Sequence, residues 1–213
     1  SSGSYPVRLV ATSNRGCVHT TTSTITVTSM PVANFTVSGL EVCLGRSIDF
    51  MNNSTVDAGG LAYVWNFGDG TTSTQISPSK SYASPGTYTV SLQATSGSNL
   101  TSTQSISLVV RPRPLVNFTV NDVCIGNTHT FINTSSISSG NLQYTWDFGV
   151  GGQTSTIISP NFAYTVVGTY LTKLKAVSDF GCKDSTTRST ALNPVPNAYF
   201  TANQVCRGEN TGF

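Results

Sequence analysis

Few side chains in this sequence could do chemistry, and Asp69 is the most prominent acidic one. It stands in the turn Phe67-Gly68-Asp69-Gly70, directly after an alternating stretch that contains Trp65. Such a carboxylate could join loop carbonyls around a hard cation such as Ca²⁺, or it could cap the amides of its own turn. No second carboxylate is near in the sequence. We therefore favour the cap, keep Asp69 as a weak Ca²⁺ candidate, and predict no other metal or cofactor site.

The remaining reactive residue types do not form a catalytic pattern. His19 and His129 both lie in Thr-rich strand contexts, and we expect them on solvated strand faces. No Ser-His-Asp or Cys-His arrangement repeats along the chain, and the acidic residues are too scattered for a paired-carboxylate site. The sequence therefore predicts that this chain is not an enzyme.

The five cysteines fall into two classes. Three lie in Val-Cys-x-Gly turns, and the other two follow Gly just before a late strand. The turn class is Cys43, Cys124 and Cys206, and the second class is Cys17 and Cys182. No Cys-x-x-Cys or Cys/His spacing indicates zinc, so disulfides in an exported protein are the better interpretation.

The elements that position these residues are predicted to be β-strands, and their sequence pattern recurs along the chain. Tyr63, Trp65 and Phe67 alternate with Val64 and Asn66, which is the period of a half-buried strand, and helical periodicity is absent. Trp65 and Trp146 are 81 residues apart, and Cys43 and Cys124 are also 81 apart. The period is close to 82 residues, which is the mark of a tandem array.

This period divides the chain into four parts. We expect the last strands of a preceding unit at 1–30, complete units at 31–112 and 113–195, and the first strands of a following unit at 196–213. An isolated strand pair cannot bury a core, so the two end fragments are expected to be ordered only by neighbouring material.

One motif in the first complete unit resembles the PKD (polycystic kidney disease) domain family. It comprises Trp65, Phe67, Gly68, Asp69, Gly70, Tyr82, Pro85, Gly86 and Tyr88. The second unit repeats it with Trp146, Phe148, Gly149, Tyr164, Gly168 and Tyr170. It departs at Val150, which stands where the Asp should be, and at Val167, which replaces Pro. The resemblance implies an all-β fold of tandem immunoglobulin-like antiparallel β-sandwiches.

Seven strands are expected in each unit. In the first they are 34–37, 48–52, 63–67, 72–75, 80–82, 87–95 and 102–110. Alternation predicts a core of Phe35, Ile48, Phe50, Trp65, Phe67, Tyr82, Tyr88, Val90, Leu92, Ile106 and Leu108. The corresponding core of the second unit is Phe118, Phe131, Trp146, Phe148, Tyr164, Tyr170 and Leu174. Tyr63 and Tyr144 share the face of the buried Trp and are also expected in the core rather than on a sugar-stacking surface.

Two disulfide pairings are compatible with the sequence. A bond within the second unit would join Cys124 to Cys182, but strand directions place these residues about one strand length apart. A disulfide needs Cα atoms within about 7 Å. Units in a head-to-tail rod would instead bring Cys43 beside Cys182. We favour Cys43–Cys182, with Cys124–Cys182 as the alternative if the segment before Cys124 folds back.

Composition limits which partners and which cellular location the chain can have. Only 9% of residues are charged and the net charge is +2, which gives no electrostatic footprint for nucleic acid. No apolar run approaches the roughly 20 residues that span a bilayer. Pro112 and Pro114 occupy the short junction between units, and proline there favours a semi-rigid spacer. We expect an extracellular, cell-surface protein whose partners are neighbouring PKD-like units and, secondarily, surface glycans or proteins.

Two functions follow from the resemblance. The first is a structural stalk segment of a long secreted adhesin or filament, which supplies reach and stiffness for surface attachment or gliding. Cys-bearing PKD arrays of this kind point to Bacteroidota adhesins, including those exported by type IX secretion. The alternative is a PKD accessory binding module of a secreted polysaccharide- or protein-degrading enzyme.

Overall fold

The computed structural model describes residues 2–201 and residue 207, and every regular element in this part of the chain is a β-strand. The all-β prediction is confirmed. The chain divides into two compact units, residues 1–112 and 113–213, each of which contains one β-sandwich. No helix in the described residues is long and apolar enough to cross a membrane. Cys206 lies outside the described residues, as does most of the fragment 196–213 that the sequence assigns to a following unit.

The chain begins with an antiparallel hairpin of β1 (Gly3–Thr12) and β2 (Val18–Val27). Its residues correspond in the repeat to the two long strands that end each sandwich. Leu9 of β1 is 65% exposed, whereas Leu92, which occupies the same place in the first sandwich, is fully buried. The hairpin therefore has the apolar side chains of a sandwich sheet, but these side chains are exposed because no second sheet packs on them in the described residues.

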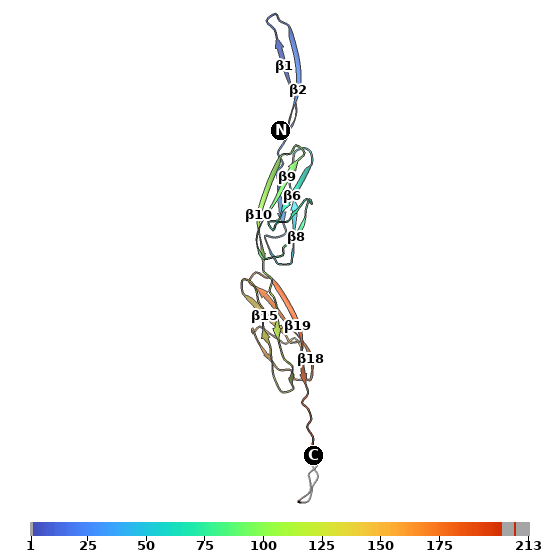
Figure 1. Cartoon of the computed structure of the whole chain (residues 1–213), viewed down its shortest axis with the longest axis vertical. Helices are drawn as coiled ribbons and strands as arrows, with labels where there is room; N and C mark the ends of the chain where they lie inside the picture. The colour runs from blue at the N-terminus through green and yellow to red at the C-terminus, as the bar shows by residue number, and fades with distance from the viewer. Residues whose placement is uncertain (1, 202–206, 208–213) are drawn as a thin grey trace. The chain divides into compact units, whose positions relative to one another are not determined.

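The first sandwich has a five-stranded sheet in the order β4-β10-β9-β6-β7 and a three-stranded sheet in the order β3-β5-β8. Figure 1 shows β10, β9 and β6 side by side. The strands are β3 (Phe35–Val37), β4 (Glu41–Cys43), β5 (Ser47–Asn52), β6 (Leu61–Asn66), β7 (Thr72–Ser73), β8 (Ser79–Ser81), β9 (Gly86–Ser96) and β10 (Thr101–Arg111).

One of these eight strands departs from the sequence expectation. β4 occupies the segment that was expected to be only a turn, and it pairs in parallel with β10, with Cys43 opposite Arg111. The sheet is therefore mixed rather than purely antiparallel. A three-residue strand is too short to show a period, and its partner lies far along the chain, so local alternation could not reveal it.

The second sandwich repeats this plan. Its large sheet has the order β12-β19-β18-β15-β16, and the smaller layer consists of two pairs, β11-β14 and β13-β17. The strands are β11 (Phe118–Thr119), β12 (Val123–Cys124), β13 (His129–Thr130), β14 (Ile132–Asn133), β15 (Leu142–Asp147), β16 (Thr154–Ser155), β17 (Asn161–Phe162), β18 (Gly168–Ser178) and β19 (Lys183–Asn193). The strand equivalent to β5 is thus divided in two around Phe131.

Both cores agree closely with the alternation in the sequence. Nearly all the predicted residues are buried, and the three tyrosine and isoleucine exceptions are half-buried against the same clusters: Tyr88, Ile106 and Tyr170. Tyr63 and Tyr144 also pack partly buried against their cores, as expected. Each core centres on a fully buried tryptophan whose indole N–H donates to a backbone carbonyl, Trp65 to Gln75 and Trp146 to Ile157, both at 2.9 Å.

His129 contradicts its sequence expectation. It was expected on a solvated face, but it is fully buried, in an edge-to-face contact with Tyr164 and beside Phe131. Its Nε2 lies 3.3 Å from the Ala191 carbonyl, and its Nδ1 has no hydrogen-bond partner. The expectation failed because the flanking threonines look solvent-facing, while the register of β13 with β17 turns His129 inward.

Candidate functional site

The first candidate site is the turn after β6, together with the side chains that contact it. Gly68 has φ +78°, and a Cβ at this position would lie 2.6 Å from the Thr89 carbonyl oxygen of β9. Only glycine fits there, because any side chain would overlap the backbone of the neighbouring strand. The Gly68 N–H donates to Asn66 Oδ1 at 2.9 Å, which closes the turn. The glycine that follows Phe67 is therefore a requirement of close backbone packing.

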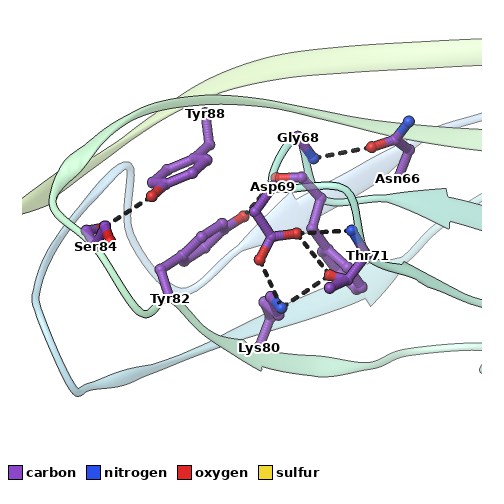
Figure 2. Close-up of polar contacts among 9 residues, drawn as sticks. Asn66, Gly68, Asp69, Thr71, Lys80, Tyr82, Ser84 and Tyr88 are labelled. Atoms are coloured by element: carbon purple, nitrogen blue, oxygen red, sulfur yellow. Dashed lines mark hydrogen bonds and ion pairs between the residues drawn. The ribbon is translucent and has the colours of Figure 1, made fainter.

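Asp69 caps this turn and also forms an ion pair (Figure 2). Its Oδ1 accepts from the Thr71 N–H at 3.0 Å and from the Thr71 hydroxyl at 2.6 Å. Its Oδ2 lies 2.7 Å from Lys80 Nζ, and the two side chains are only 19% and 18% exposed. Lys80 also donates to Thr71 Oγ1 at 2.8 Å and lies over the rings of Phe67 and Tyr82. Both oxygens of the carboxylate are thus engaged by the protein itself.

These contacts decide how the carboxylate titrates. Partial burial alone would raise the pKa of Asp69, but the hydrogen bonds from Lys80 and Thr71 outweigh it and lower the pKa to about 2. Asp69 is therefore an anion held in place by a cation, not a group poised to exchange protons near neutral pH. In the described residues, no group of three or more His, Cys, Asp or Glu side chains could hold a metal ion.

Two stacked tyrosines connect this turn to the next one (Figure 2). Tyr82 donates its hydroxyl to the Phe67 carbonyl at 3.0 Å and stacks on Tyr88, with ring centroids 4.1 Å apart. Tyr88 donates to the Ser84 carbonyl at 2.8 Å, so it ties the Pro85-Gly86 turn to the start of β9. Burial, with smaller contributions from Asp69 and Tyr88, raises the pKa of Tyr82 to about 12. The hydroxyl of Tyr82 is therefore a neutral donor that holds the turn.

The second unit keeps the tyrosines and replaces the ion pair. Tyr164 donates to the Phe148 carbonyl at 2.9 Å and stacks on Tyr170 at 3.8 Å. Phe162 stands where Lys80 stands in the first unit, and it stacks on Phe148 at 4.1 Å. Val150, in place of Asp69, packs partly buried against the core. The two positions that form an ion pair in the first unit are thus filled by apolar side chains packed against the core in the second.

Lys80 is the functional partner that sequence reasoning missed. A signal for it was present, because the unit that lacks the aspartate also lacks the lysine. Gly149 repeats the role of Gly68 in the second unit, since a Cβ there would lie 2.6 Å from the Leu171 carbonyl oxygen. Together these residues form a turn that stabilises the fold and has no reactive group.

The two cysteines of the second unit occupy opposite ends of its large sheet. Cys124 pairs in register with Asn193 at the end of β19, whereas Cys182 immediately precedes the start of that strand. Eleven strand residues, about 35 Å, separate them. Cys124 is a free exposed thiol, as is Cys17, whereas Cys43 and Cys182 are each disulfide-bonded. The alternative pairing Cys124–Cys182 is therefore wrong, because a full strand length separates the two residues.

The second candidate site is an open edge of the large sheet in the second unit. β15 pairs with β18 along its whole length, but with β16 only at Trp146 and Asp147. After Ser155 the chain leaves the edge. A cavity of about 410 Å³ opens there, between the first half of β15 and the departing segment. Leu142 and Tyr144 line it from β15, Val177 from β18, and Thr156 and Ile158 from the departing segment.

The chain is similar to known proteins in two kinds of sequence comparison. A protein-family model described as "PKD domain" matches residues 28–110 and 111–210. The pre-pro-metalloprotease PrtV of Vibrio cholerae is 32% identical over an alignment of 173 residues, which covers 76% of this chain and 17% of that protein. A microbial collagenase of Vibrio alginolyticus is 41% identical over 69 residues, which are 32% of this chain and 8% of the collagenase. The chain thus spans less than a fifth of the length of these relatives.

Two solved structures are similar to this chain over less than half of its length, which corresponds to about one unit. The PKD1 domain of Vibrio anguillarum Epp is 36% identical and covers 39% of this chain and 96% of that domain, with a TM-score of 0.36. The PKD1 domain of the Vibrio cholerae metalloprotease PrtV is 32% identical and covers 38% of this chain and 98% of that domain, with a TM-score of 0.35.

Proposed function

Since the chain belongs to the PKD domain family, we propose that it is a non-catalytic accessory module of a secreted protein-degrading enzyme. The observation that carries this proposal is its similarity to PrtV across 173 residues, which extends over most of both sandwiches. The similarity to a collagenase favours the same class of parent protein. The described side chains support a role other than catalysis, because the best-placed carboxylate, Asp69, is neutralised by Lys80.

Such a module would work by contact with a protein substrate while another part of the parent protein cuts it. Its low charge suits this role, since binding through a surface with few charged side chains depends little on salt concentration. The module is expected to act outside the cell, where an enzyme of this class meets its substrates.

A sedimentation assay tests this function. The 213-residue chain is mixed with collagen fibrils, with agarose-coupled gelatin, and with chitin or cellulose particles, and bound protein is measured after washing. We expect retention on the protein materials and not on the polysaccharides. Retention on polysaccharide alone would instead indicate that the parent protein degrades carbohydrate. Retention on none of these materials would refute the accessory-module function.

A second candidate is a stalk segment of a long secreted cell-surface adhesin or filament, including the exported adhesins used in attachment or gliding. It is favoured by the 82-residue repeat and by the proline-containing junction at Pro112 and Pro114. Its partners would be neighbouring PKD-like units, with surface proteins or glycans as contacts. The complete open reading frame distinguishes the two candidates: a hydrolase domain supports the accessory module, and dozens of further PKD copies support the stalk.

A further inference from the structure

We propose that the open edge of β15 binds an extended, uncharged polypeptide strand, which adds to the sheet by backbone hydrogen bonds. Because a protein substrate supplies such strands, this inference rests on the proposed accessory function and names the site that would serve it.

The hydrogen-bond parity of β15 identifies which backbone groups are available. The Asn141 carbonyl accepts from the Asp179 N–H on the β18 side, whereas the Phe148 N–H donates to Gln153 on the opposite side. Backbone groups alternate sides along a strand, so those of Leu142 and Tyr144 point away from β18. β16 pairs only with Trp146 and Asp147. The N–H and C=O groups of Leu142 and Tyr144 therefore face an edge that no strand of the described chain covers.

Two residues on one side of a strand, spaced two apart, match the hydrogen-bond repeat of an added antiparallel strand. The existing β15–β16 ladder shows the geometry, because an incoming strand would continue it from Trp146 towards Leu142. A sheet edge of this kind is specific for backbone amides, which a polypeptide has and a plain polysaccharide chain lacks.

The lining of the cavity beside the edge indicates which type of side chain the bound polypeptide would place in it. Its lining contains no charged residue, and its apolar part comes from Leu142, Tyr144, Val177 and Ile158. A charged side chain there would lose its hydration without a partner, so an aliphatic or aromatic side chain is expected. Ile158 is 64% exposed at the mouth of the cavity, where it is available to cover such a side chain.

The first unit repeats the same arrangement of residue types. Leu61 and Tyr63 lie at the equivalent positions on β6, which likewise pairs with β7 only at its last two residues, Trp65 and Asn66. Thr74 and Ile76 correspond to Thr156 and Ile158, and Ile76 is similarly exposed at 67%. The edge is therefore a feature of both units, and each could take one strand.

A matched pair of variants tests this site on the whole 213-residue chain. Ile158→Asp places a charge at the cavity, whereas Ile157→Asp places the same charge on the adjacent side chain, which is 65% exposed and does not line the cavity. Neither isoleucine side chain is in the core, so both variants should fold. The probe is a synthetic strand-forming peptide of alternating Thr and Val, titrated by NMR.

We expect the peptide to slow amide exchange at Leu142 and Tyr144 at least tenfold, with little change at Gln143 and Thr145, whose amides already face β18. Ile158→Asp should weaken peptide binding at this edge at least tenfold, and Ile157→Asp less than twofold. Unchanged exchange at Leu142 and Tyr144, or equal effects of the two variants, would overturn the site.

The other occupants of the edge are also outcomes of this experiment. Protection of the same amides by cellohexaose in place of the peptide, or by self-association of the chain without any ligand, would refute the polypeptide proposal. Failure of the chain to sediment with collagen and gelatin, combined with protection by the peptide, would refute the accessory function and leave this site standing. Sedimentation that is equal in both variants would keep the function and reject the site.

Discussion

His129 of the second sandwich occupies the position that Ile48 occupies in the first. Ile48 lies opposite Lys80 in the β5–β8 pair, and His129 lies opposite Phe162 in the β13–β17 pair. Both side chains are essentially fully buried. A polar ring with an unpaired Nδ1 thus fills a place that the other unit gives to a hydrocarbon side chain.

Replacing this histidine by the residue of the first unit should stabilise the second sandwich. His129→Ile removes a buried nitrogen without a hydrogen-bond partner, which typically costs about 1–3 kcal/mol. We expect a gain of about 1–2 kcal/mol, measured by hydrogen exchange of second-unit peptides, because exchange reports the free energy of opening of each unit separately. Ile48→His is the reciprocal control and should destabilise the first unit. Equal or lower stability of His129→Ile would show that the Nε2 contact with Ala191 dominates.

Gly68 and Gly70 provide a matched test of the turn after β6. Both have positive φ, but a Cβ at Gly68 would lie 2.6 Å from the Thr89 carbonyl oxygen, whereas a Cβ at Gly70 meets nothing within 4 Å. Gly70→Ala should cost about 1 kcal/mol for the left-handed backbone alone. Gly68→Ala should cost at least 2 kcal/mol more, because the strands must also separate. Urea unfolding of the first unit measures both, and similar losses would refute the close-packing explanation.

The ion pair of Asp69 predicts a pH dependence for the first unit. The folded pKa of about 2 lies below the ordinary value near 3.9, so the stabilisation is complete above about pH 5 and is lost as pH falls through 2. Because both side chains are partly exposed, we expect about 1–2 kcal/mol rather than the full shift. Asp69→Asn should lower stability at pH 7 and flatten this part of the pH profile. An unchanged profile in Asp69→Asn would assign the acid loss to other carboxylates.

The two apolar side chains that the second unit carries at these positions should be able to replace the ionic pair of the first. We expect the double variant Asp69→Val with Lys80→Phe to be close to the wild type in stability, because Val150 and Phe162 both pack against the core of the second unit. Each single change should cost more than the double change, since it leaves a partly buried charge or a mismatched ring. Additive losses in this double-mutant cycle would show that the two positions are independent.

The partners of the disulfide-bonded cysteines can be identified directly. We propose that Cys43 pairs with Cys182, which would restrain the junction between the units. Non-reducing peptide mapping should yield one linked peptide that contains both residues. Cys17 and Cys124, which are exposed free thiols, should react with iodoacetamide without prior reduction. A linked peptide that contains Cys43 with any other cysteine would refute the proposed bridge.

The sequence by itself determined the repeat, the fold class and most of both cores. Trp65, Val90 and Leu92 are buried as their alternation predicts, because the side chains of a strand change face at every residue and a local pattern carries that information. The glycine of the Phe-Gly turn is recognisable for the same local reason. Cys124 and Cys182 could also be placed at opposite ends of a unit, since counting strand directions needs only their order.

Only the tertiary structure decided the features that depend on residues distant in the chain. The parallel strand β4, the inward turn of His129 and the open edge of β15 all follow from strand register. The salt bridge joins Asp69 in the turn after β6 to Lys80 in β8, and comparison of the two repeats shows only that the two residues are lost together, not that they are in contact. Register and long-range pairing arise from packing of the two sheets against each other, and a one-residue shift would turn every one of these side chains to the other face.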